Sequence, residues 1–297
     1  MADIEKQTNG DKASPSRQIE HSSQNGDVTT MDAKAAAEHF VPPSPAEEAA
    51  VIRKLDFRLI PLVFFLYMLS VLDRSNLGNA RLAGMEEDID LTGFKYNWLG
   101  TIFYIAYILS QWLLIGWKQF PPHIWCAGVV FFWGFIASIQ AAVFNWGGLM
   151  ACRFFLGVAE AAYGPGVPLY LTYFYPREKV GFRHGMFIAG AAMANAYGGA
   201  LAYGISQING SIAPWRILFL IEGLPTCAFA ALAWFFLPDS IQKAPFLNER
   251  EKQVALHFVA RNQRVDVGQK QGVRLKELFD GLKDPKSFIP GIMYFSW

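Results

Sequence analysis

The pattern of apolar and charged positions divides the chain into a polar beginning, a long apolar region and a second polar stretch. The first fifty or so residues are rich in Asp, Glu, Ser, Gln and Lys without a sustained apolar period, which is typical of a disordered tail. Apolar windows of about twenty residues then recur, each long enough to cross a bilayer as a helix. They predict six membrane-spanning helices, at about residues 57–80, 98–117, 124–144, 148–174, 185–205 and 217–237.

The charges between the spans predict their orientation. Arg53, Lys54 and Arg58 precede the first span, and the connection between the fourth and fifth spans is also basic. Because Lys and Arg concentrate on the cytoplasmic side of membrane proteins, both features predict a cytoplasmic N-terminus. The apolar run at residues 288–297 is about half as long as a crossing needs. It predicts a seventh span that is cut short.

We therefore expect an all-α membrane protein in four parts. These are a disordered cytoplasmic tail (1–54), a six-span transmembrane bundle (55–238), a cytoplasmic basic loop (239–287) and the truncated start of a seventh span (288–297). A hydrophobic content of 53% with 15% aromatic residues agrees with a membrane class.

The remaining composition narrows the function. Each of the three cysteines lies alone in an apolar run, which favours packing over disulfides or metal binding. The net charge of +1 does not indicate a nucleic-acid partner. The sequence contains no Gly-x-Ser-x-Gly elbow and no His-Glu-x-x-His pair, so we expect neither an enzyme nor a cofactor or metal site.

Two charged residues interrupt the fourth apolar run. Arg153 and Glu160 are seven positions apart, so they lie about 20° apart in azimuth on one helix face, with Gly157 between them. Ionisable groups inside a membrane survive mostly where they pair or line a water-filled pathway. The two could form a static, neutralising pair, or Glu160 could alternate between proton-bound and ionised states.

Two further polar residues lie within the spans. A stripe of Gly and Ala spaced by four in the fifth span predicts close packing against another helix. Asn195 adjoins this stripe, where it could join helices or contact a substrate. Glu222, near the start of the sixth span, is expected to have a structural role through a pair with Arg216.

The motifs, in order and spacing, resemble a known family. They are Leu72-Asp73-Arg74-Ser75-Asn76-Leu77-Gly78-Asn79-Ala80, then Arg153 through Gly166, then Trp215-Arg216, Phe219, Glu222-Gly223-Leu224-Pro225, Leu237-Pro238-Asp239 and Phe246-Leu247. Together they are similar to the N-terminal half of a major facilitator superfamily transporter. Within that superfamily they look like the anion:cation symporter family, in its fungal allantoate and nicotinate permease-like branch.

The resemblance implies alternating-access symport of a proton with a small organic anion, such as allantoate, nicotinate or pantothenate, at the plasma membrane. By position, Arg74 is the expected contact for the substrate anion, with Asn76 beside it, and Arg153 with Glu160 is the expected proton-coupling pair. Alternatively, Asp73 and Arg74 could mark the outer end of the first span. The resemblance also implies a second half of the fold as a partner, which this sequence does not encode.

The short loop after the second span keeps only one Gly and little positive charge, whereas the superfamily usually carries a Gly, an Asp and several basic residues there. A non-transporting membrane sensor or interaction protein is the alternative to a transporter.

Overall fold

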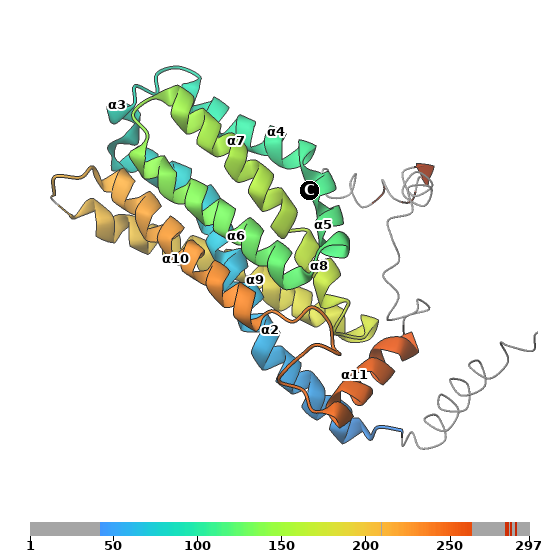
Figure 1. Ribbon diagram of the computed structural model, residues 1–297. Helices are drawn as coiled ribbons and strands as arrows, with labels where there is room; N and C mark the ends of the chain where they lie inside the picture. Colours follow the sequence, from blue (N-terminus) through green and yellow to red (C-terminus); the bar gives the residue numbers. More distant parts are fainter. Residues whose placement is uncertain (1–41, 209, 263–282, 285, 287–288, 290–297) are drawn as a thin grey trace, which may run out of the picture. The chain divides into compact units, whose positions relative to one another are not determined.

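The computed structural model describes residues 42–208, 210–262, 283–284, 286 and 289. Most of the predicted tail, most of the predicted basic loop beyond residue 262 and most of the predicted start of the seventh span lie outside them. Within these residues every regular element is helical, as the sequence predicts (Figure 1). The elements are α2 (Pro45–Ala80), η1 (Arg81–Met85), α3 (Glu86–Asp88), α4 (Lys95–Leu109), η2 (Gln111–Ile115), α5 (Gly116–Gln119), α6 (Pro122–Ile139), η3 (Gln140–Ala142), α7 (Trp146–Tyr163), α8 (Gly166–Leu171), α9 (Arg177–Ser206), α10 (Pro214–Phe236) and α11 (Glu249–Asn262).

All six predicted spans are helical, but they differ in how apolar they are. By length and composition, three of the described helices could cross a membrane: the one that includes α2, α6 with η3, and α10. The pair formed by α4 and η2–α5, bent by 44°, makes a fourth if it counts as one span. By the same measure, the helices α7 and α9 are not apolar enough to be counted as spans. Arg153 and Glu160 interrupt α7, whereas α9 begins with charged residues and continues mainly with Gly and Ala.

The first long helix starts earlier than the hydropathy pattern predicts. A reciprocal cap begins α2: the Ser44 hydroxyl accepts from the Glu47 amide at 3.2 Å, and the Glu47 carboxylate accepts from the Ser44 amide at 2.9 Å. Pro45 occupies the first helical position, where its missing N–H is not needed. The predicted tail boundary at residue 54 is therefore corrected, because residues 45–54 are helical.

Glycines bring three pairs of helices close together. On α9, a Cβ added to Gly190 would lie 2.8 Å from the Phe64 carbonyl oxygen of α2, so only glycine fits that contact. Gly157 of α7 faces the Phe103 carbonyl of α4 in the same way, and Gly223 of α10 faces α6. The prediction that the Gly and Ala stripe of α9 packs against another helix is confirmed.

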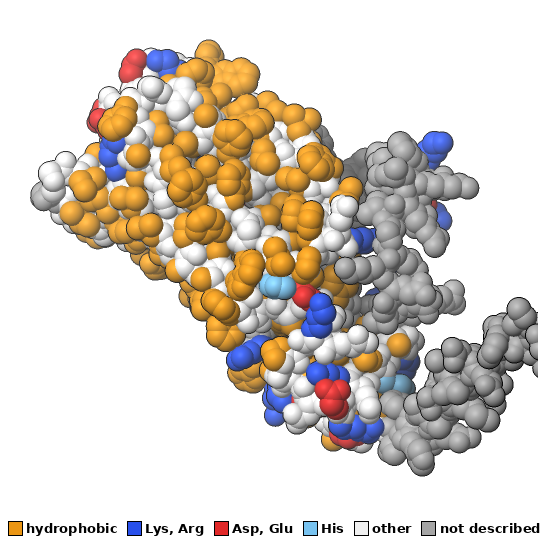
Figure 2. Space-filling model, viewed as in Figure 1, with side chains coloured by type: hydrophobic (Ala, Val, Ile, Leu, Met, Phe, Trp, Pro, Cys, Tyr) orange, Lys and Arg blue, Asp and Glu red, His pale blue; other side chains and the backbone are white. Residues whose placement is uncertain are grey.

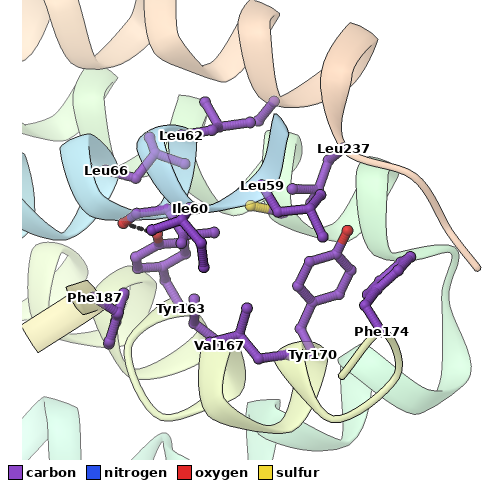
Figure 3. Close-up of a cluster of buried hydrophobic side chains, with 14 of the residues drawn as sticks. Leu59, Ile60, Leu62, Leu66, Tyr163, Val167, Tyr170, Phe174, Phe187 and Leu237 are labelled. Carbon is purple, nitrogen blue, oxygen red and sulfur yellow. Dashed lines mark hydrogen bonds between the residues drawn. The ribbon is translucent and has the colours of Figure 1, made fainter. Parts of the chain in front are cut away.

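Aromatic side chains join the far end of α7 to α2, and join α8 to the segment after α10 (Figure 3). Helix α7 ends at Tyr163 and α8 begins at Gly166, so the helix is broken at Pro165. The Tyr163 hydroxyl donates to the Val63 carbonyl at 3.2 Å, and the Tyr170 hydroxyl donates to the Pro238 carbonyl at 2.8 Å. These bonds satisfy both buried phenols and hold the broken helix in place.

The surface separates apolar from charged side chains. Figure 2 shows apolar side chains across the face formed by α6, α7 and α10, with charges gathered toward the ends of these helices. Exposed large apolar residues include Phe131 and Phe135 on α6 and Phe235 on α10. A broad exposed apolar surface of this kind suits contact with lipid.

The last described helix, α11, packs against the beginning of α2. Val254 and Phe258 of α11 are buried in the same apolar cluster as Val51 and Leu55 of α2. Three ion pairs surround this contact: Lys54 with Glu251 at 2.9 Å, Glu47 with Arg250 at 3.4 Å, and Glu48 with Arg261 at 3.3 Å. Helix α11 begins at Glu249, directly after Asn248.

Candidate functional site

The central charged contact joins α2 to α7. Nε of Arg74 lies 2.5 Å from Oε2 of Glu160, in an ion pair between the first and fourth predicted spans. The same carboxylate oxygen accepts the Ser70 hydroxyl at 2.9 Å. Ser70 is four positions before Arg74, so both side chains leave α2 on one face and reach the same oxygen.

The two partners of this ion pair differ in exposure. The Arg74 side chain is 25% exposed, whereas the Glu160 side chain is 0% exposed. Aromatic rings of α4 flank the guanidinium, with its Cζ 5.5 Å from the Phe103 ring centre and 5.0 Å from that of Tyr107. Arg74 is therefore partly open to the surface of the described chain, while Glu160 is enclosed behind it.

The expected direct pair between Arg153 and Glu160 is not formed. Arg153 is buried and donates from Nη1 to the Asp73 carbonyl oxygen at 3.3 Å, with the Phe219 ring 5.6 Å from its Cζ. No ion pair to Arg153 within 4.0 Å occurs in the described chain. Seven residues of helix separate the two Cα atoms by about 10 Å along the axis, so sharing a face does not bring the charged groups together.

Asp73 also lies inside the protein. Its side chain is buried, and Oδ2 accepts the indole N–H of Trp133 on α6 at 2.6 Å. Because its side chain is buried within the protein, Asp73 does not reach the surface of the described chain, as snorkelling to lipid headgroups would require. Trp133 and Tyr107 were not predicted from the sequence, because neither is charged. Ser70 could have been found by following the face of Arg74 back one helical turn.

The expected pair between Glu222 and Arg216 is also absent. Arg216 binds Asp88 at 3.2 Å and the Ala141 carbonyl at 2.9 Å. Six residues of helix turn by about 600°, which leaves Arg216 and Glu222 about 120° apart around α10. Glu222 is buried, and neither of its carboxyl oxygens has a hydrogen-bond partner among the described residues.

The two predicted asparagines lie in different surroundings. Asn76 is fully buried, and its side-chain oxygen accepts from Asn79 at 3.1 Å within α2. Asn195 is exposed on α9, beside the buried Ala194. Within the described chain, no hydrogen bond joins either asparagine to Arg74 or Glu160. Their roles as substrate contacts remain predictions.

Comparisons with known proteins agree with this architecture. The family model of the Major Facilitator Superfamily matches residues 63–295. The MFS-type transporter efuF of Hormonema carpetanum is 39% identical over 71% of this chain and 43% of its own length. The major facilitator-type transporter hxnP of Emericella nidulans is 35% identical over 90% of this chain and 55% of its own length. The chain thus spans about half the length of these curated relatives.

A solved structure shows the same fold. It is a bacterial homologue of the human lysosomal transporter Spinster in an inward-facing, unoccupied conformation, with a TM-score of 0.56 at 16% identity, covering 82% of this chain and 50% of that one. At this identity the likeness concerns the fold alone. From the family model and the relatives, the chain belongs to the Major Facilitator Superfamily.

Proposed function

We propose that this chain carries the anion-binding and proton-coupling groups of a symporter for a small organic anion. The substrate class is a carboxylate such as allantoate, nicotinate or pantothenate, in keeping with the resemblance to the anion:cation symporter family. The observation that carries the proposal is the ion pair between partly exposed Arg74 and buried Glu160.

Exchange at Arg74 couples the anion to the proton. A planar guanidinium holds a carboxylate through two parallel hydrogen bonds, so a substrate carboxylate can replace Glu160 on Arg74. Glu160 then remains fully buried without its cation. Because an unpaired carboxylate is strongly disfavoured inside a protein, Glu160 takes up a proton as the anion binds.

The reverse exchange releases both the substrate anion and the proton. When the anion leaves, Arg74 again attracts Glu160, and the proton dissociates as the pair re-forms. Arg153 has a positioning role in this scheme, since its bond to the Asp73 carbonyl ties α7 to α2 next to Arg74. Alternating access also requires the second half of the fold, which forms the opposite wall of the substrate cavity. We therefore propose the transport activity for the complete gene product.

Transport assays with the complete gene product in lipid vesicles test this proposal. Glu160→Gln mimics the protonated acid, so we expect proton-driven accumulation of the carboxylate to be lost while exchange of labelled for unlabelled anion continues. The matched control is Glu86→Gln, which removes an acid that also pairs with an arginine, Arg81, but at the start of α3 and with a side chain that is 39% exposed. Proton-driven accumulation by Glu160→Gln at the level of the control would refute the coupling role.

A further inference from the structure

Glu222 is the one glutamate of the buried charge cluster that the proposed exchange does not use. The cluster consists of three acids and two arginines: Asp73, Glu160, Glu222, Arg74 and Arg153. Glu222 is 2% exposed, on the inward face of α10. The charged groups of the described chain that act on it are Asp73 from α2 and Arg153 from α7. The neighbouring Gly223 meets α6 at the uncharged residues Gly134 and Ser138.

The charges of this cluster do not balance when every group is ionised. Three carboxylates against two guanidinium groups leave one negative charge in excess. An uncompensated charge inside a protein is disfavoured by several kcal/mol, and groups in that position neutralise instead. One of the three acids must therefore hold a proton even when no substrate is bound.

Hydrogen bonding indicates which acid this is. Asp73 accepts the Trp133 indole N–H, and Glu160 accepts from both Arg74 and Ser70, so each has donors that favour its ionised form. The carboxyl group of Glu222 has no hydrogen-bond donor among the described residues. The hydroxyl one turn away, that of Thr226, donates to the Glu222 backbone carbonyl at 2.8 Å and not to its carboxyl group.

We propose that Glu222 carries a resident proton that keeps the charge cluster neutral throughout the transport cycle. With Glu222 neutral, the empty state contains two carboxylates and two arginines. If the exchange proposed above is correct, the loaded state contains Asp73 and the substrate as anions, with Glu160 protonated, and it is neutral as well. The proton on Glu222 therefore stays in place while the proton on Glu160 is carried.

Infrared spectroscopy tests this without any substrate. The sample is the purified chain in lipid at about pH 7, where exposed Asp and Glu are ionised. We expect the carbonyl stretch of a protonated carboxylic acid, and we expect Glu222→Gln to remove it. The control Glu86→Gln removes an exposed acid and should keep the band. A band absent from the unmodified chain, or unchanged in Glu222→Gln, would overturn the proposal.

A second variant guards against a Glu222→Gln chain that fails to fold. Glu222→Asp keeps the acid, and labelling with ¹³C-glutamate shows which residue type carries the band. We expect the label to shift the band of the unmodified chain and to leave the band of Glu222→Asp unshifted. An unshifted band in the unmodified chain would place the proton on Asp73, and a shifted band in Glu222→Asp would place it on Glu160. Neither measurement depends on transport, so the outcome is separate from that of the proposed symport.

Discussion

Arg74 and Glu160 are 86 positions apart in the sequence, yet Nε of Arg74 lies 2.5 Å from Oε2 of Glu160. The contact joins an accessible cation on α2 to an enclosed acid on α7. Its geometry depends on the guanidinium, because Nε faces Glu160 while the rings of Phe103 and Tyr107 flank the planar group. A lysine at this position would keep the charge and lose the planar fork.

We therefore predict that Arg74→Lys weakens carboxylate binding by about tenfold or more, since one of two charge-assisted hydrogen bonds is lost. Calorimetric titration of the complete gene product with nicotinate, allantoate and pantothenate measures this. Arg81→Lys is the control, because Arg81 also pairs with a glutamate and stacks on a tyrosine, but at the exposed end of α2. Equal weakening by the two substitutions would argue against a specific anion contact at Arg74.

The contact between α2 and α9 gives a prediction about stability. A methyl group at Gly190 would meet the Phe64 carbonyl oxygen at 2.8 Å, whereas nothing lies within 4 Å of a methyl group at Gly199. We expect Gly190→Ala to lower the free energy of unfolding by roughly 1–3 kcal/mol, because the backbones must separate. Gly199→Ala should be neutral or slightly stabilising. Denaturant unfolding in detergent compares the two, and similar losses would contradict this packing.

The sequence predicts the helices better than it predicts the contacts between them. Apolar windows located all six long helices, and the spacing of small residues identified the packing face of α9. The spacing of Arg153 and Glu160 was sufficient to place them on one face of α7. It could not show that Glu160 turns to Arg74, because spacing within a helix determines azimuth and not which neighbouring helix supplies a partner.

The errors at Glu222 and at the start of α2 have different causes. Nearness in sequence favours a pair between Glu222 and Arg216, although six positions place them on different sides of α10. Hydropathy does not locate the start of α2, because it measures membrane character and not helicity. The local signal was present in Ser44, Pro45 and Glu47, a serine cap with proline next and glutamate three residues on.

Acid should release α11 from α2. A hydrogen bond from the Lys54 ammonium group holds the pKa of Glu251 below its ordinary value of 4.5. The Ser44 backbone N–H, with help from Arg250, does the same for the pKa of Glu47. A lowered pKa contributes stability that is present above the ordinary value and lost as the pH falls through the lowered one. The contact should therefore be complete at neutral pH and weaken below about pH 4.5.

Double electron–electron resonance distances between spin labels at Ala49 and Gln253, exposed positions on α2 and α11, can follow this release. We expect the distribution to broaden as the pH falls, and Glu251→Gln to broaden it already at neutral pH. Glu249→Gln is the control, because Glu249 pairs with Lys252 of its own helix. A distribution that stays narrow in acid would show that the apolar contact alone holds α11.

Trp133 and Trp117 allow a final comparison at the buried acid Asp73. Both indoles are buried and donate one hydrogen bond, Trp133 to the Asp73 carboxylate at 2.6 Å and Trp117 to the Ala162 carbonyl at 2.7 Å. Replacement by Phe removes each donor and a similar volume. Because hydrogen bonds to charged groups contribute about 1.5–3 kcal/mol against about 1 for neutral pairs, we predict a larger loss of stability for Trp133→Phe than for Trp117→Phe. Unfolding in detergent gives the difference, and equal losses would argue against an ionised carboxylate at Asp73.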